Sequence, residues 1–272
     1  MPLLPGGADS LLPGMTTANF WIFFQVLARV SAVIAIAPVF GAREVPAQVK
    51  TGMALMLSRV LSPIAAPALT RYPLPTTLYG FTATIAGDAV VGLLIGFVMS
   101  LVLSAVQMAA SVLDIQVGFS MAQTLNPEIG ELSAPLTQLQ SMYALLLFLL
   151  ARGHYLTIEG LAHSFTALPA QAVAIGTGGA LRSFTDVTYG MLVDALEIAA
   201  PAGAVLLAVD LSFAFVSRAM PQMNVFVVGM PVKSLVGLTT LVVVLPLFAV
   251  FVGNLVAHAG GGLVAVLGGF HR

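Results

Sequence analysis

The chain has 272 residues and a net charge of −1; 59% of its residues are hydrophobic and 8% are charged. Soluble domains carry about 25% charged residues, so this composition excludes an ordinary water-soluble protein and predicts an integral membrane protein with membrane lipid around it. The absence of cysteine excludes disulfides and thiolate ligands, and the lack of a clustered basic face excludes a nucleic-acid partner.

The pattern of apolar residues predicts an all-α fold of about six long hydrophobic helices, some of them kinked. A spanning helix needs about 20 apolar residues. Residues 1–17 hold no Lys or Arg, unlike a cleavable signal peptide, and we expect a flexible segment there. A Gly-rich tail is expected over 258–272, and 18–257 is expected to form a single membrane domain. Its helices are predicted at about 18–37, 46–66, 79–112, 134–160, 184–217 and 232–257.

The third and fifth segments exceed the length that a bilayer requires, so we expect them to tilt, bend or leave the bilayer plane. Pro201 should kink the fifth segment, and Pro63, Pro67, Pro73 and Pro75 break the stretch after the second. Basic residues divide almost evenly between the two sides of an alternating six-helix topology, so they select no orientation.

The third segment carries a polar stripe of small and hydroxyl-bearing residues that recur every third or fourth position. Such a row on one helix face indicates protein neighbours, because unsatisfied polar groups in hydrocarbon are costly. Two interpretations stay open: a helix-packing seam or a wall of an aqueous path. The stripe consists of Asp88, Gly92, Gly96, Ser100, Ser104, Gln107 and Ser111 and continues to Asp114.

The fifth segment carries four carboxylates, which in a membrane segment favour a functional hypothesis such as a proton or cation relay. Structural pairing or placement at the membrane interface is the competing interpretation, with Arg29, Lys50 and Arg59 as possible partners. The sequence leaves this choice open for Asp186, Asp194, Glu197 and Asp210.

The central loop between the third and fourth segments mixes polar and apolar residues between the helix breakers Gly118 and Asn126-Pro127. Irregular backbone at membrane depth is tolerated only inside protein or beside a water-filled cavity. The loop is therefore either an exterior turn or an insertion that plugs a cavity. Periodicity alone favours the exterior turn.

Motifs of catalysis are missing from the sequence. There is no phosphate-binding Gly-rich loop ending in Gly-Lys-Ser/Thr, no His-Glu-x-x-His and no Gly-x-Ser-x-Gly. His154, Glu159 and His163 are spaced so that a helix spreads them apart instead of gathering them around a metal. We therefore expect no enzyme activity, no catalytic residue, no metal and no cofactor.

Two stretches, Ala37–Lys50 and Ser217–Lys233, resemble signatures of the FliR family of type III export-gate subunits. The central Gln116–Ser120 followed by Asn126-Pro127 is also similar to that family. These motifs run from the first segment to the last, and Pro-Gln-x-Asn-Val-Phe is the most specific of them. The residues that carry the resemblance in the two stretches are Pro38, Phe40, Gly41, Pro46 and Lys50, then Arg218, Pro221, Gln222, Asn224, Phe226, Gly229, Pro231 and Lys233.

The resemblance implies a non-enzymatic subunit of the flagellar export gate in the bacterial inner membrane, within the flagellar basal body. It implies a FliP-like part followed by a FliQ-like hairpin, with FliP-like, FliQ-like, FlhB-like and FlhA-like partners and unfolded flagellar proteins as substrates. By the same resemblance the central loop faces the conduit, which reverses the preference from periodicity. The implied conduit residues are Gly118, Phe119, Ser120 and Met121, with Met121 as a flexible apolar seal.

Three other interpretations remain. A homologous subunit of a virulence-type injectisome would keep the fold and change the machine. A proton-coupled secondary transporter would explain the intramembrane acids and the Pro201 break, but predicts pseudo-symmetric halves, and no repeat is visible. A purely structural membrane subunit would need no conduit.

Overall fold

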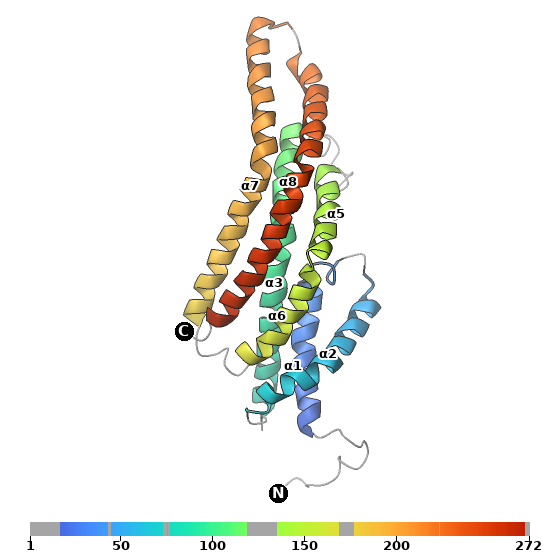
Figure 1. The fold of residues 1–272 in the computed structure, drawn as a ribbon, viewed down its shortest axis with the longest axis vertical. Coiled ribbons are helices and arrows are strands. Elements are labelled where there is room, and N and C mark those ends of the chain that lie inside the picture. The colour runs from blue at the N-terminus through green and yellow to red at the C-terminus, as the bar shows by residue number, and fades with distance from the viewer. Residues whose placement is uncertain are drawn as a thin grey trace. The chain divides into compact units, whose positions relative to one another are not determined.

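The structure is a computed structural model that describes residues 17–42, 45–72, 75, 77–118, 135–168, 177–222 and 224–269. Throughout these residues the regular structure is helical, which confirms the predicted all-α fold (Figure 1). The helices are α1 (Thr17–Ile36), α2 (Ala47–Leu69), α3 (Leu78–Val117), α5 (Pro135–Leu150), α6 (Gly153–Ala167), α7 (Thr177–Ala219) and α8 (Val225–Gly269).

Five of the described helices, α1, α2, α3, α7 and α8, are long and apolar enough to cross a membrane, and α5 with α6 makes a sixth if the pair counts as one span. The expectation of about six long hydrophobic helices is thereby confirmed. Three of them, α3, α7 and α8, have 40, 43 and 45 residues. At 1.5 Å per residue each is about twice as long as the hydrocarbon core is thick.

The structure differs from the expected fourth and last segments. A single helix was expected over 134–160, but α5 ends at Leu150 and α6 begins at Gly153. Arg152 between them has a φ of 58°, in the left-handed region that a continuing helix cannot use. In the tail expected over 258–272, α8 continues to Gly269.

Proline is a weaker signal of a helix end in this chain than it is in a soluble protein. The second helix passes through Pro63 and Pro67 before it ends at Leu69, and α8 contains Pro231 and Pro246. Pro removes one backbone hydrogen bond, but membrane helices tolerate it because nearby hydroxyls and local adjustment satisfy the freed groups.

The chain divides into two compact units. The first holds the described residues of 1–100, 153–187 and 259–272. Its core joins α1, α2, the first half of α3, α6 and the end of α8. In helix α2 the residues that face this core recur at spacings of three and four, which places them on one face of the helix. They are Ala54, Ser58, Leu61, Ala65 and Leu69.

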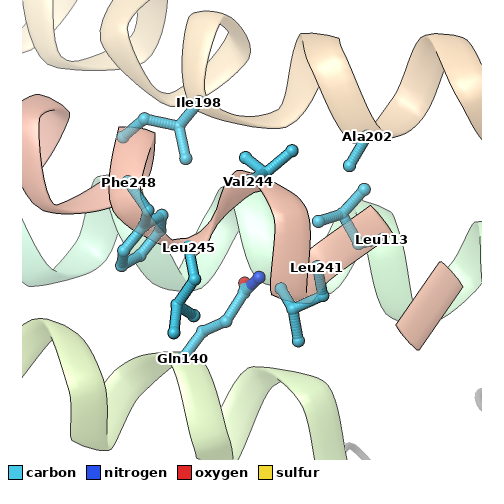
Figure 2. Close-up of a pocket in the computed structure, with 8 residues that line it drawn as sticks. All are labelled: Leu113, Gln140, Ile198, Ala202, Leu241, Val244, Leu245 and Phe248. Atoms are coloured by element: carbon cyan, nitrogen blue, oxygen red, sulfur yellow. The ribbon is translucent and has the colours of Figure 1, made fainter. Parts of the chain in front are cut away.

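The second unit holds the described residues of 101–152 and 188–258. Leu113 and Val117 of α3 pack there with Leu136 of α5 and Leu206 of α7. Beside this cluster lies a cavity of about 10 Å³, and Figure 2 shows the Gln140 side chain among its apolar walls. The Gln140 Oε1 atom is buried and has no hydrogen-bond partner in the described residues. Tyr143 stacks on Phe248 with ring centroids 5.7 Å apart, which adds to the contact of α5 with α8.

Candidate functional site

Asp114, near the end of α3, anchors the first turn of α5 on the far side of the central loop. Its Oδ1 accepts the Leu136 N–H at 3.2 Å, and its Oδ2 accepts the Thr137 N–H at 2.9 Å and the Thr137 hydroxyl. The first N–H groups of a helix have no partner within the helix, and a carboxylate there also opposes the positive end of the helix dipole. The buried Asp114 carboxylate therefore ties the two ends of the segment 119–134 together.

Gly118 ends α3 in a conformation that suits glycine. Its φ is 95°, and its N–H donates to the carbonyls of Asp114 and Ile115 at 3.1 and 3.2 Å. This is the hydrogen-bonding pattern of a glycine that terminates a helix. A Cβ built on Gly237 of α8 would lie 2.5 Å from Val117 Cγ2, so α3 and α8 approach closely beside this end. Of the implied conduit residues the structure places Gly118; Phe119, Ser120 and Met121 lie outside the described residues.

The polar stripe on α3 divides between two environments. Asp88 is buried, and Gly92 and Gly96 lie against α1. A Cβ on Gly92 would collide with the Arg29 carbonyl oxygen, so only glycine allows this approach. Farther along, the Ser100 hydroxyl donates to the Phe97 carbonyl at 2.8 Å. The side chains of Ser104, Gln107 and Ser111 are exposed on the isolated chain.

The first family motif forms the turn between α1 and α2. Pro38 is buried after α1, and Phe40 packs against the core of the first unit. A Cβ on Gly41 would lie 2.8 Å from the Ala35 carbonyl oxygen, so the close turn requires glycine there. The Lys50 ammonium donates to the Gly41 carbonyl at 3.0 Å, and Pro46 precedes α2. The motif residues thus shape this turn and hold it to α2.

The second family motif forms the turn between α7 and α8. Asn224 stands just before α8 and accepts the Val227 N–H with its backbone carbonyl at 3.1 Å and with its side-chain Oδ1 at 3.4 Å. Gly229 is buried beside Phe213 of α7. Lys233 of α8 forms an ion pair with Asp210 of α7. Four other motif positions are exposed, namely Arg218, Pro221, Gln222 and Pro231; Phe226 begins α8, and its side chain lies outside the description.

The strongest polar cluster in the described chain is one that the sequence analysis missed. Arg29 of α1 uses all five of its N–H donors. It donates to Asp88 Oδ1 of α3 from Nε at 2.9 Å and from Nη2 at 2.5 Å, to the Ser164 carbonyl and hydroxyl at 2.8 and 3.0 Å, and to the Leu168 carbonyl at 2.9 Å. The centroid of the Phe165 ring lies 4.5 Å from the guanidinium carbon of Arg29.

This cluster replaces one of the expected pairings. Arg29 was a possible partner for the acids of the fifth segment, but it binds the first acid of the α3 stripe. A charge in the middle of a span costs about 3 kcal/mol, which the opposite charge and the satisfied donors offset. The signal available in the sequence was a single charge inside the first apolar segment and an opposite charge inside the third.

The four acids of α7 have separate environments. Asp210 pairs with Lys233, and Asp194 Oδ2 lies 3.8 Å from His258 Nδ1. Asp186 and Glu197 are exposed. Among the described residues, no three His, Asp or Glu side chains lie together in a way that could hold a metal ion.

The comparisons with known proteins agree with this architecture. The model of the family described as "Bacterial export proteins, family 1" matches residues 20–259. The chain belongs to this family. The flagellar biosynthetic protein FliR of Bacillus subtilis (strain 168) is 33% identical over 245 residues, which cover 86% of this chain and 90% of that protein.

Further relatives are named for flagellar biosynthesis and for the translocation of Yop proteins. FliR of Escherichia coli (strain K12) is 30% identical over 235 residues, 86% of this chain and 88% of that protein. The Yop proteins translocation protein T of Yersinia pestis is 27% identical over 206 residues, 74% of this chain and 75% of that protein. This member of Bacterial export proteins, family 1 is thus a membrane protein with relatives of both kinds.

Proposed function

We propose that this chain is a non-enzymatic subunit of the flagellar type III protein export gate and forms part of the conduit for unfolded flagellar proteins. The observation that carries the proposal is the family match over residues 20–259, together with FliR relatives aligned along most of the chain. By the same argument it resides in the bacterial inner membrane, in the flagellar basal body. Its partners are FliP-like and FliQ-like subunits, with FlhB-like and FlhA-like components beside them.

The central loop is the part of the chain that we assign to closure of the conduit. The Asp114 carboxylate holds the end of α3 and the start of α5 together, so the described residues on either side of the segment 119–134 are fixed to each other. Flexible apolar side chains can seal a narrow path by excluding water and then yield to a passing chain. Met121, Phe119 and Ser120 beside Gly118 take that role in the proposal.

The exposed half of the α3 stripe supports a multi-subunit function. Gln107 and Ser111 are polar and exposed on a helix that is apolar enough to span a membrane. The Ser111 hydroxyl donates to the Met108 carbonyl of α3 at 2.8 Å. Lipid is a poor environment for the Gln107 amide, whereas a neighbouring subunit or an aqueous conduit satisfies its hydrogen bonds. The stripe therefore remains assigned to helix packing at Asp88, Gly92 and Gly96. It is assigned to contacts beyond this chain at Ser104, Gln107 and Ser111.

The test is affinity purification of the tagged chain from mild detergent, with mass spectrometry of the proteins that accompany it. FliP-like and FliQ-like proteins in one large complex are the expected result. A stable monomer or homodimer without export proteins would contradict the proposal and favour a transporter. Deletion of the gene then separates two machines: lost motility indicates the flagellum, whereas lost effector injection indicates the injectisome alternative, which the relative named for translocation of Yop proteins favours.

A further inference from the structure

Helix α2 carries an arginine where a lipid-facing helix should have none. Arg59 stands near the middle of α2 (Ala47–Leu69), so about 15 Å of helix separates it from either end. Its side chain is exposed. Long basic side chains reach the membrane interface only from near the ends of a span, and a charge at mid-span otherwise needs a partner.

Nothing in the described part of the chain supplies that partner. The ion pairs found there join Arg29 to Asp88, Lys233 to Asp210 and His258 to Asp194. The neighbouring hydroxyls of Ser58 and Ser62 donate to carbonyls of α2 itself. Arg59 therefore lacks an anion that its position in an apolar helix requires.

The surroundings of Arg59 have the features of a binding site for another helix. Met56 and Val60 on either side of it are 74% and 63% exposed. Two turns earlier, Gly52 is exposed, and a Cβ built on it meets nothing within 4 Å. A glycine on an outward face lets a second backbone approach closely.

A groove between α1 and α2 continues this face toward the start of α2. Its volume is about 360 Å³, and Leu27 and Ile34 of α1 and Leu55 of α2 contribute apolar walls. Thr51 and Leu55 precede Arg59 at intervals of four residues, so all three share one strip of the helix. A helix that lies along this strip would cover both the groove and the arginine.

We propose that this face of α2 binds a transmembrane helix of another subunit of the export apparatus, which places a carboxylate opposite Arg59. The inference rests on the proposed function, since it assumes a membrane complex. Charge complementarity selects the occupant, because hydrocarbon chains offer no anion at that depth. A buried Asp or Glu on a partner helix forms an ion pair with the arginine, and each charge compensates the other.

The experiment uses cells in which the tagged full-length chain is the only copy, and it measures the export subunits recovered per tagged chain in the membrane. Arg59→Glu should lower recovery about tenfold or more, because reversal places like charges in the contact. Arg71→Glu, at an exposed arginine just beyond α2, is the matched control and should leave recovery unchanged. Arg59→Leu should also lower recovery of the export subunits. Because this variant makes α2 more apolar and favours membrane insertion, a lower recovery cannot be attributed to failed insertion.

A photo-crosslinking residue in place of Met56 identifies the neighbouring protein. When a mid-span carboxylate of that protein is replaced by Lys, recovery with Arg59→Glu should return. Equal recovery for Arg59→Glu and Arg71→Glu would overturn the inference, as would crosslinks to lipid alone. Rescue by reversal of an acid in this same chain would overturn it as well. Absence of export subunits with the unaltered chain would instead contradict the proposed function.

Discussion

The two units of the chain use charged groups differently. In the first, Arg29 and Asp88 have fully buried side chains, and the guanidinium joins α1, α3 and the end of α6. In the second, the side chains of the Lys233–Asp210 pair are 25% and 42% exposed, and the buried Asp114 caps a helix start. The first arrangement depends on an internal charge pair, whereas the second combines apolar packing with weaker polar links.

The difference shows which region can tolerate rearrangement. Removing one partner of a buried ion pair costs about 3–5 kcal/mol because the other charge stays buried without compensation. An exposed pair contributes about 0–1 kcal/mol. We therefore expect the first unit to be a rigid support. The second unit carries the ends of the central loop and can change its polar contacts at much lower cost.

The largest expected effect is at the buried pair. Asp88→Asn should lower the free energy of unfolding by about 3–5 kcal/mol, since it leaves the Arg29 charge uncompensated. Thermal denaturation of the purified protein in detergent, or its resistance to protease, measures this loss. The double variant Arg29→Met with Asp88→Leu is the control and should recover most of the stability. A loss under about 1 kcal/mol for Asp88→Asn would contradict the assigned rigidity.

The next effect is steric and lies in the same unit. Gly92→Ala should destabilise the protein by about 1–3 kcal/mol, because the new Cβ meets the Arg29 carbonyl and lies 2.8 Å from the Ala32 Cβ. Gly190→Ala on α7 is a matched control, since a Cβ there meets nothing within 4 Å. The same thermal measurement applies to both. Equal stability of the two variants would show that α1 and α3 can separate without penalty.

A smaller effect is expected at the loop anchor of the second unit. Asp114→Ala removes the acceptor of the Leu136 and Thr137 N–H groups and should cost about 1–2 kcal/mol, as loss of a helix cap does. We expect slowed export or ion leakage at near-normal expression, because the ends of the segment 119–134 come apart. Export of a flagellar substrate and membrane ion permeability measure this outcome. Normal export with an intact permeability barrier would argue against the loop assignment.

The smallest effect is expected at the half-exposed pair. Lys233→Met should change the free energy of unfolding by about 1 kcal/mol or less, because solvent or headgroups screen the attraction to Asp210. Thermal denaturation beside Asp88→Asn gives the direct comparison. If both variants lose the same stability, the contrast between the two units is wrong.

Local sequence patterns predicted most of the helices but not all of their ends. Apolar runs are long enough to place α1, α2, α3, α7 and α8, since hydropathy is a property of consecutive residues. They did not place the break at Arg152, because a left-handed φ at a non-glycine residue depends on surrounding packing. They also counted Pro63 and Pro67 among the residues that break the stretch after the second segment, whereas α2 passes through both, because proline is tolerated within packed membrane helices.

The sequence predicted residues of the candidate site but not the contacts that they make. The motif residues Gly41 and Lys50 were identified by their resemblance to a family, and the turn that they share became visible only in the fold. The carboxylate Asp114 was read as the last member of a stripe. Its role as a cap appeared only when α5 was placed beside α3, because a helix start more than 20 residues away leaves no periodic signal at Asp114.

By itself the sequence determined a membrane-embedded, all-α chain and its family, because hydrophobicity, segment length and motif order are all read along the chain. The tertiary structure decided which charge meets which. Arg29 bonds to Asp88 across 59 residues and to Ser164 across 135. The same packing leaves Arg59 without an anion among the described residues. Ion pairing depends on distances of a few ångströms between side chains on different helices, and only the packing of those helices sets these distances.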